Sequence, residues 1–173
     1  IGKRVLELGA GSGVISKAII DKKNGVVTAI DINPSRLLCE RVQNVLKADL
    51  NDQNWIDNFD TKDKFDVVIA ADVIEHLYDP WKVLSQIKTL LDKDGVIILS
   101  LPHAAHSGLL AALLHSNVRY EETGLLDKTH IRFFGLENIM TMHKDAGLDI
   151  TEIKYVLKRP EETEHHDLWE NLS

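Results

Sequence analysis

The sequence predicts a doubly wound α/β domain, in which a mostly parallel sheet carries helices on both faces. Short apolar segments alternate with amphipathic ones along the chain, which is the pattern of consecutive β–α–β units. Most of the apolar segments are runs of Val, Ile and Leu without alternation, as expected of strands that are buried on both faces. A glycine-rich turn between the first strand and the first helix completes the pattern.

Six strands are expected along the chain. The first five are the unalternated runs, at residues 5–8, 26–30, 45–48, 65–70 and 96–101. The sixth, at residues 148–157, alternates apolar and polar side chains, so we expect it at an edge of the sheet.

Four helices are expected between these strands. Two of them begin with a polar N-cap followed by proline at the first helical position. Asn33-Pro34 opens a helix that runs through residue 43, and Asp79-Pro80 opens a helix over residues 81–91. The other two, 12–22 and 135–146, are closed by Gly25 (after Asn24) and by Gly147.

Length and composition favour one ordinary globular domain, which we place at residues 1–159, with a C-terminal tail at 160–173. The net charge of -7 argues against a nucleic-acid partner, because phosphate binding needs a basic surface. The single cysteine, Cys39, has no partner for an intramolecular disulfide, so we expect a reducing compartment, the cytoplasm. The longest apolar run, 108–114, is too short to span a bilayer, so no integral membrane segment is expected.

The chain starts at Ile1, almost inside the first predicted strand, and ends in an acidic, weakly patterned tail. We therefore expect further residues beyond both ends, and the chain can be one part of a multidomain protein. The sequence does not indicate an oligomeric state.

An irregular insertion of residues 102–134 follows the fifth strand. In an open α/β sheet, ligands bind at the carboxyl ends of the strands, so this insertion is expected to cover the site. Within it, residues 107–115 are nearly all apolar. They predict either a helix packed over the sheet edge or a lid that meets a lipid-linked acceptor.

The turn after the first strand reads V-L-E-L-G-A-G-S-G over residues 5–13. A dinucleotide-binding fingerprint would require glycine at position 14, where the chain has Val14, and the Gly-Lys-Ser/Thr ending of a P-loop is absent. The turn resembles the E-x-G-x-G-x-G signature of class I methyltransferases that use S-adenosylmethionine (SAM). The resemblance implies a Rossmann-like fold and cofactor contacts from Glu7, Gly9, Ala10, Gly11 and Gly13.

Two acids at later strand ends extend the resemblance. Asp31 ends the second strand, where a carboxylate accepts both ribose hydroxyls, and Asp49 follows the third strand, where the family binds the adenine amino group. Taken alone, Asp31 is equally explained as a helix cap and Asp49 as a turn residue. Residues 65–80 are also similar to the family's F-D-x-V-x-x-x-x-V-x-E-H-x-x-D-P stretch. The family further implies cofactor contacts from Ile32, Leu50 and Ala71, and S-adenosylhomocysteine (SAH) as the product.

Three histidines are candidates for the base that removes a proton from a hydroxyl acceptor. His76 follows the fourth strand and His103 the fifth, whereas His130 lies in a run at 126–134 that looks like the L-D-x-T-H-x-R-F-F stretch of a subgroup linked with envelope sugars. Capping or anchoring roles are the alternatives for all three. Glu75 and Arg132 are expected at the acceptor site. No spacing of ligand residues predicts a metal site.

The sequence therefore predicts SAM-dependent O-methylation of a small-molecule or sugar acceptor, with a role in envelope polysaccharide synthesis. A quinone-type phenol is the alternative acceptor. The alternative class is a SAM-binding module without catalysis inside a larger protein. A nicotinamide-dependent dehydrogenase is disfavoured by Val14 and by the missing second nucleotide-binding half. The missing Asn-Pro-Pro-Tyr tetrad disfavours methylation of nucleobase or glutamine amino groups.

Overall fold

The computed structural model describes residues 3–39 and 41–157. The chain forms two compact units, Ile1–Leu101 and Pro102–Ser173. The predicted cover at 102–134 falls within the second unit, and the predicted tail at 160–173 lies outside the described residues.

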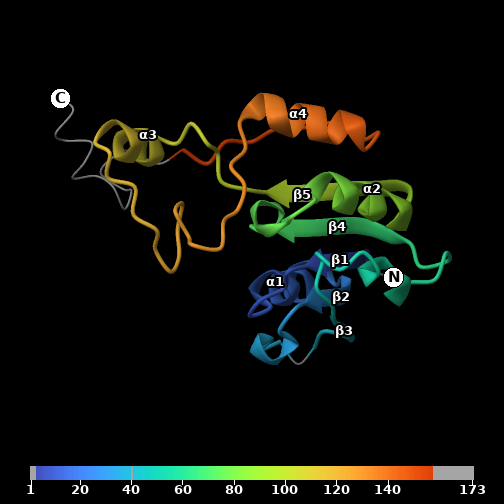
Figure 1. Cartoon of the computed structure of the whole chain (residues 1–173). Coiled ribbons are helices and arrows are strands. Elements are labelled where there is room, and N and C mark those ends of the chain that lie inside the picture. Colours follow the sequence, from blue (N-terminus) through green and yellow to red (C-terminus); the bar gives the residue numbers. More distant parts are fainter. Residues whose placement is uncertain (1–2, 40, 158–173) are drawn as a thin grey trace. The chain divides into compact units, whose positions relative to one another are not determined.

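A five-stranded parallel sheet in the order β3-β2-β1-β4-β5 forms the first unit (Figure 1). Since β1 lies in the middle and the order reverses between β1 and β4, the carboxyl ends of these two strands flank the crevice in which ligands bind in such sheets. This α/β architecture confirms the predicted fold class. The strands are β1 Arg4–Leu8, β2 Val26–Asp31, β3 Asn44–Lys47, β4 Phe65–Ala71 and β5 Leu91–Ser100.

Among the residues that the structure describes, four α-helices and three short 3-10 turns form besides the strands. The helices are α1 Val14–Lys23, α2 Pro80–Leu90, α3 Ser107–Leu114 and α4 Leu136–Asp145, and the turns are η1 Pro34–Arg36, η2 Trp55–Asn58 and η3 Ile74–His76. Asn24 closes α1 in the left-handed conformation, and the Asp79 side chain accepts a hydrogen bond from the Lys82 N–H at the start of α2. These two caps confirm the predicted end of the first helix at Asn24 and the predicted start of α2 at Asp79-Pro80.

The helix predicted over residues 33–43 is wrong, because among the described residues there, 33–39 and 41–43, only η1 is helical. After Leu37 the chain is extended, and the Leu38 N–H donates to the Ser12 carbonyl. Leu37 and Cys39, two positions apart, both pack against the core beneath α1. This spacing of two is that of extended chain, so tertiary packing overrides the helix start signal at Asn33-Pro34.

The sixth strand predicted at 148–157 is also wrong, because these described residues join no ladder. Tyr155 and Leu157 are exposed, the latter at 87%. Alternation indicates a strand only where a neighbouring strand supplies hydrogen-bond partners. The strand β5 begins earlier than predicted: Leu91 already pairs with Phe65, and the register then shifts between Phe65 and Val67.

Apolar side chains bury both faces of the sheet. On one face, Val5, Val27 and Ala29 pack with Ile15 and Ile19 of α1. Leu6, Leu8, Ile30 and Val68, which alternate with these along the strands, are essentially fully buried on the other. The helix α2 buries Val83, Leu84, Ile87 and Leu90.

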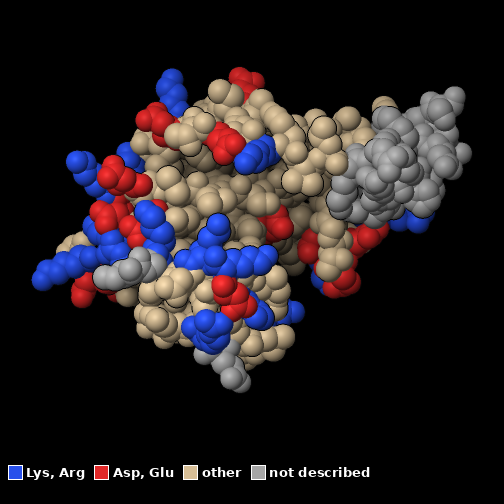
Figure 2. Space-filling view, turned by 180° about the vertical axis from the view of Figure 1, so that it is seen from behind, with Lys and Arg blue, Asp and Glu red and all other residues tan. Residues whose placement is uncertain are grey.

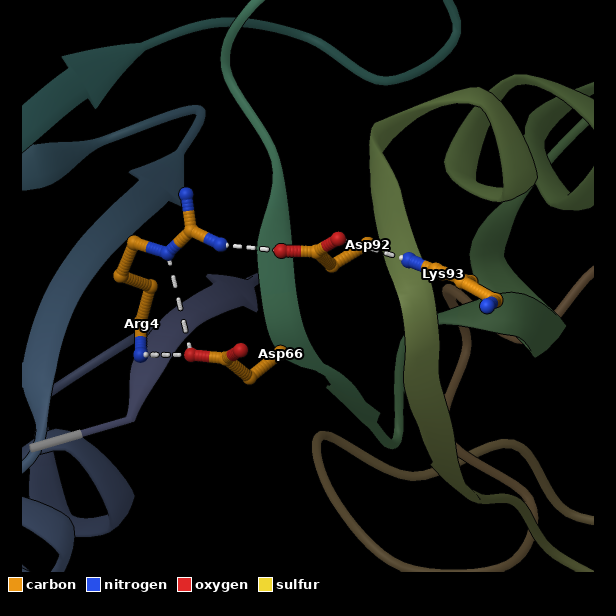
Figure 3. Close-up of polar contacts among 4 residues, drawn as sticks. All are labelled: Arg4, Asp66, Asp92 and Lys93. Atoms are coloured by element: carbon orange, nitrogen blue, oxygen red, sulfur yellow. Dashed lines mark hydrogen bonds and ion pairs between the residues drawn. The ribbon is translucent and has the colours of Figure 1, made fainter.

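An ion-pair cluster joins three strands at the edge opposite the strand carboxyl ends (Figure 3). The backbone N–H of Arg4 donates to Asp66 at 2.6 Å, and the Arg4 guanidinium pairs with Asp92. The pKa of Asp92 is held below its ordinary value, first by the hydrogen bond from the Lys93 backbone N–H and then by Arg4. The cluster therefore ties β1 to β4 and β5 where the strands begin.

Acidic and basic side chains intermix on the face drawn in Figure 2, so neither sign dominates it. Among the described residues, no helix combines the length and the apolar character that crossing a membrane requires.

Candidate active site

The loop between β1 and α1 has three glycines in the left-handed conformation. Their φ angles are +64° at Gly9, +53° at Gly11 and +78° at Gly13, values that side chains rarely adopt. A Cβ at Gly9 would lie 2.5 Å from Val73 Cγ2, and one at Gly13 would lie 2.7 Å from Leu37 Cδ1. A Cβ at Gly11 would meet nothing closer than 4.0 Å. The outer two glycines therefore serve the packing of the loop, whereas Gly11 borders open space.

Glu7 supports this loop from inside the sheet. It is 2% exposed and accepts a hydrogen bond from the hydroxyl of Ser16, which is fully buried in α1. Burial raises the pKa of Glu7, while the hydrogen bonds from the Ser16 side chain and backbone oppose that rise. The residue that the sequence placed in the cofactor site therefore joins β1 to α1 around the glycine loop.

This burial predicts a pH dependence of stability. Because the folded pKa of Glu7 lies above the unfolded value, the folded state binds more protons between those two values, and stability falls as pH rises through that window. Glu7→Gln keeps an acceptor for Ser16 and removes the charge. Urea unfolding gives the free energy of unfolding at each pH. Between pH 4.5 and neutrality, we expect this free energy to decline less in the variant than in the wild type. An unchanged pH slope would contradict it.

Asp31, at the end of β2, accepts two backbone hydrogen bonds. Its Oδ2 accepts from the Gly11 N–H and its Oδ1 from the Asn33 N–H, both at 2.7 Å. A carboxylate offers about four lone-pair sites, so Asp31 retains acceptor capacity for two hydroxyl groups. Asp31 caps no helix, since the N-cap of η1 is Asn33, and its two loop contacts are compatible with the ligand role.

Asp49 lies two residues after β3. Its Oδ1 accepts from the Asn51 N–H at 2.8 Å, and Asn51 in turn accepts from the Tyr78 N–H at 2.8 Å. This chain of hydrogen bonds joins the loop after β3 to the segment after β4. Asp49 is consequently held at a fixed position along the strand ends.

One cavity of about 230 Å³ spans the carboxyl ends of the first four strands. Of the residues predicted from the sequence, it brings together Gly9, Asp31, Ile32, Asp49, Leu50 and His76. Glu7, Ala10, Gly11, Gly13 and Ala71 are not among its lining residues. Ala71 packs instead against the core beneath α1, as does the buried Ala10.

The cavity also contains residues that sequence analysis missed, among them Asn51, Asp72, Val73 and Leu77. Three of them belong to the stretch 65–80 whose resemblance was recognised, so that stretch was the available signal. Glu75, predicted at the acceptor site from the same stretch, is fully buried. A second cavity of about 320 Å³ shares Ile32, Ala48 and Asp49 with the first and continues to Lys47, Asp52 and Trp55.

These residues fit SAM by the chemistry of their donors and acceptors. Asp31 and Asp49 offer carboxylates for the ribose hydroxyls and the adenine amino group, and Ile32 and Leu50 offer apolar surface for the base. Gly11 leaves space next to the loop that a Cβ would occupy. Two carboxylates at the strand ends suit this cofactor better than the pyrophosphate of a dinucleotide.

The second unit contains the other two candidate bases, and their hydrogen bonds assign opposite tautomers. His103 Nδ1 accepts from the Ala105 N–H at 3.0 Å, so the neutral ring carries its proton on Nε2. His130 Nδ1 lies 3.0 Å from the Leu125 carbonyl oxygen. A carbonyl oxygen only accepts, so Nδ1 of His130 carries the proton and Nε2 has the lone pair. Of the two, only neutral His130 presents a basic Nε2.

The run at 126–134 forms a hydrogen-bonded turn. Asp127 Oδ1 accepts from both the N–H and the hydroxyl of Thr129, and the His130 N–H donates to the Asp127 carbonyl. Phe134 is 3% exposed, and its backbone forms an isolated parallel β-bridge with that of His103. Arg132 is exposed. Asp127, Thr129 and Phe134 therefore have structural roles in this turn. The role of His130 and Arg132 at the acceptor site stays a prediction.

The apolar run at 107–115 is mostly the helix α3. Its residues Leu109 and Ala112 pack against Leu125 and Leu126 within the second unit. Leu113 and Leu114 are exposed, at 56% and 72%. The helix therefore has one buried side and one exposed apolar side.

Residues 2–153 match the family described as methyltransferase domain. The chain is 33% identical over 163 residues to a ubiquinone biosynthesis O-methyltransferase of Haemophilus ducreyi, covering 88% of this chain and 68% of that protein. A second relative, of the same name, from Aeromonas salmonicida is 25% identical and covers 92% of this chain and 68% of its own length. With the Actinobacillus pleuropneumoniae (serotype 5b) protein of that name, the match covers only 45% of the relative.

Solved structures share the fold at lower identity. A methyltransferase from Archaeoglobus fulgidus, described as SAM-dependent, has a TM-score of 0.64 at 17% identity, covering 98% of this chain and 79% of its own. The methyltransferase complex of Haloferax volcanii gives a TM-score of 0.67 at 20% identity, covering 87% and 63%. The assignment rests on the match to the domain family and to the Haemophilus relative. A glycine loop and strand-end acids that fit SAM support it. The chain belongs to the methyltransferase domain family and is a SAM-dependent methyltransferase.

Proposed function

We propose that the protein methylates a hydroxyl group of a small molecule, and that this acceptor is a quinone-type phenol. The observation that carries the proposal is the position of His76, which lines the same cavity as Gly9 and Asp31. An imidazole in that cavity suits a reaction in which a hydroxyl must lose its proton. The phenol is favoured over other hydroxyls because the Haemophilus relative is named a ubiquinone biosynthesis O-methyltransferase.

The chain's own residues have distinct tasks in this reaction. Bound SAM supplies a methyl group on a positively charged sulfur. Asp31 and Asp49 orient the ribose and the adenine, and the side chains of Ile32 and Leu50 contact the base. His76 accepts the proton of the acceptor hydroxyl, which leaves a more nucleophilic oxygen. Roles at the acceptor site are proposed for Glu75, His130 and Arg132 from the resemblance of their segments, and for His103 from its place just after the fifth strand.

A sugar hydroxyl in envelope polysaccharide synthesis is the second candidate. It is favoured by the run at 126–134, which resembles the subgroup linked with envelope sugars. Both acceptors require the same proton transfer, so the site chemistry alone does not separate them. Sugar hydroxyls are weaker acids than phenols and depend more strongly on the base.

Purified protein with SAM and a panel of acceptors tests the proposal. We expect methylation of quinone-type phenols such as catechols, detected by mass spectrometry. Little methyl transfer to sugar nucleotides or monosaccharides is expected. Transfer to sugars alone would overturn the phenol assignment in favour of the second candidate. SAM binding without transfer to any hydroxyl acceptor would indicate a binding module that lacks catalysis.

A further inference from the structure

We propose that Asp72 binds the α-ammonium group of the cofactor, and that Ser100 positions Asp72 for this contact. Through this contact the pocket distinguishes adenosyl ligands that carry an amino-acid group from those that lack it. The inference rests on the cofactor orientation in the proposed function, with adenine at Asp49 and ribose at Asp31, and it is independent of the acceptor.

The strand order places Asp72 at one end of the cofactor pocket. Asp49 follows β3 and Asp31 ends β2. Gly9 follows β1 and Asp72 follows β4, and all four residues line the same cavity. Neighbouring strands lie about 4.8 Å apart, so the three spacings from β3 to β4 amount to roughly 14 Å. A cofactor with its adenine at β3 and its ribose at β2 therefore has its amino-acid group toward β1 and β4.

The charges that line the cavity favour an ammonium group at this end. The described residues that line it include three carboxylates, at Asp31, Asp49 and Asp72, and no lysine or arginine. With Asp31 and Asp49 expected at the ribose and the adenine, Asp72 is the carboxylate that remains for the amino-acid group. It attracts an ammonium group and repels the carboxylate of the cofactor. The ammonium group is therefore the part of the amino acid that Asp72 binds.

Two hydrogen bonds to the end of β5 hold Asp72 in position. Its N–H donates to the Ser100 carbonyl at 2.9 Å, and its Oδ1 accepts from the Ser100 hydroxyl at 3.2 Å. Its φ of +53° lies in the left-handed region, where Asp and Asn are enriched among the non-glycine residues. A carboxylate offers about four lone-pair sites, so the bond from the Ser100 hydroxyl leaves acceptor capacity for an ammonium group.

Asp72→Asn tests the proposal, because asparagine tolerates the left-handed conformation and retains an oxygen that accepts from Ser100. Calorimetric titrations use SAH, SAH without its amino group, and 5′-methylthioadenosine, which lacks the whole amino-acid group. We expect affinity for SAH to fall by about three- to tenfold, since Asp72 is exposed and solvent screens the charge pair. Affinity for the other two ligands should not fall. Equal losses for SAH and its deaminated form, or no loss for SAH, would overturn the proposal.

Ser100→Ala removes the hydroxyl contact and keeps the backbone hydrogen bond. It should lower SAH affinity by a smaller factor than Asp72→Asn does, and leave the binding of 5′-methylthioadenosine unchanged. A merely structural role for Ser100 predicts a lower melting temperature without this dependence on the ligand. Normal SAH affinity in Ser100→Ala would overturn the positioning role.

Asp31→Asn is the matched control, since it removes a charge from a residue expected to bind the ribose that all three ligands share. It should weaken the binding of all three together. If it leaves every affinity unchanged, the proposed cofactor orientation is wrong, and the inference about Asp72 falls with it. If Asp31→Asn weakens all three and Asp72→Asn leaves SAH affinity unchanged, the orientation stands and only the inference is overturned.

Discussion

Gly11→Val should lose SAM binding while the protein remains folded. A Cβ at Gly11 points into open space beside the loop, so the substitution meets no protein atom but occupies volume that the cofactor needs. We expect SAM affinity to fall by about 100-fold or more, which corresponds to roughly 2.7 kcal/mol. The left-handed φ of +53° adds backbone strain of about 1–3 kcal/mol, which lowers the melting temperature without unfolding the domain.

Gly13→Val is the contrasting variant. Its Cβ would lie 2.7 Å from Leu37 Cδ1 and 3.2 Å from the Cβ of Cys39, so we expect a larger loss of stability than at Gly11. Calorimetric titration and thermal unfolding on both variants separate the two effects. Near-normal SAM affinity in folded Gly11→Val would show that the cofactor does not approach this part of the loop.

His76→Ala should lower turnover by about 10²–10⁴-fold, the usual contribution of a positioned general base. SAM affinity should change much less, because the acids and the glycine loop expected to contact the cofactor lie on other elements. Added imidazole should restore part of the turnover, because a soluble base can replace the missing ring. A merely structural role for His76 predicts no such rescue.

His130→Ala and His143→Ala complete the comparison. Both rings have Nδ1 within hydrogen-bond distance of a backbone carbonyl, at 3.0 Å for His130 and 2.7 Å for His143, so both variants lose a similar structural contact. If His130 is only an anchor, the two variants should lose stability alike and keep normal turnover. A large loss of turnover in His130→Ala, with normal turnover in His76→Ala, would move the base to His130.

Local signals predicted the elements that carry the cofactor site. The glycine loop, Asp31 at the end of β2 and the proline-led start of α2 need only a few adjacent residues for their conformation, so the sequence determines them directly. Parallel strands that are buried on both faces also carry their own signature, since no side of such a strand faces water. The cofactor contacts expected at Gly9, Asp31 and Asp49 consequently fall in one cavity.

Only the tertiary structure decided the features that depend on a partner distant in sequence. The signal at Asn33-Pro34 produced one 3-10 turn, because Leu37 and Cys39 are needed in the core. The pattern at 148–157 produced no strand, since alternation does not supply a neighbouring ladder. The place of Asp72 in the cavity follows from the strand order. Propensity and spacing are local properties, whereas burial, hydrogen-bond partners and strand neighbours are set by the whole chain.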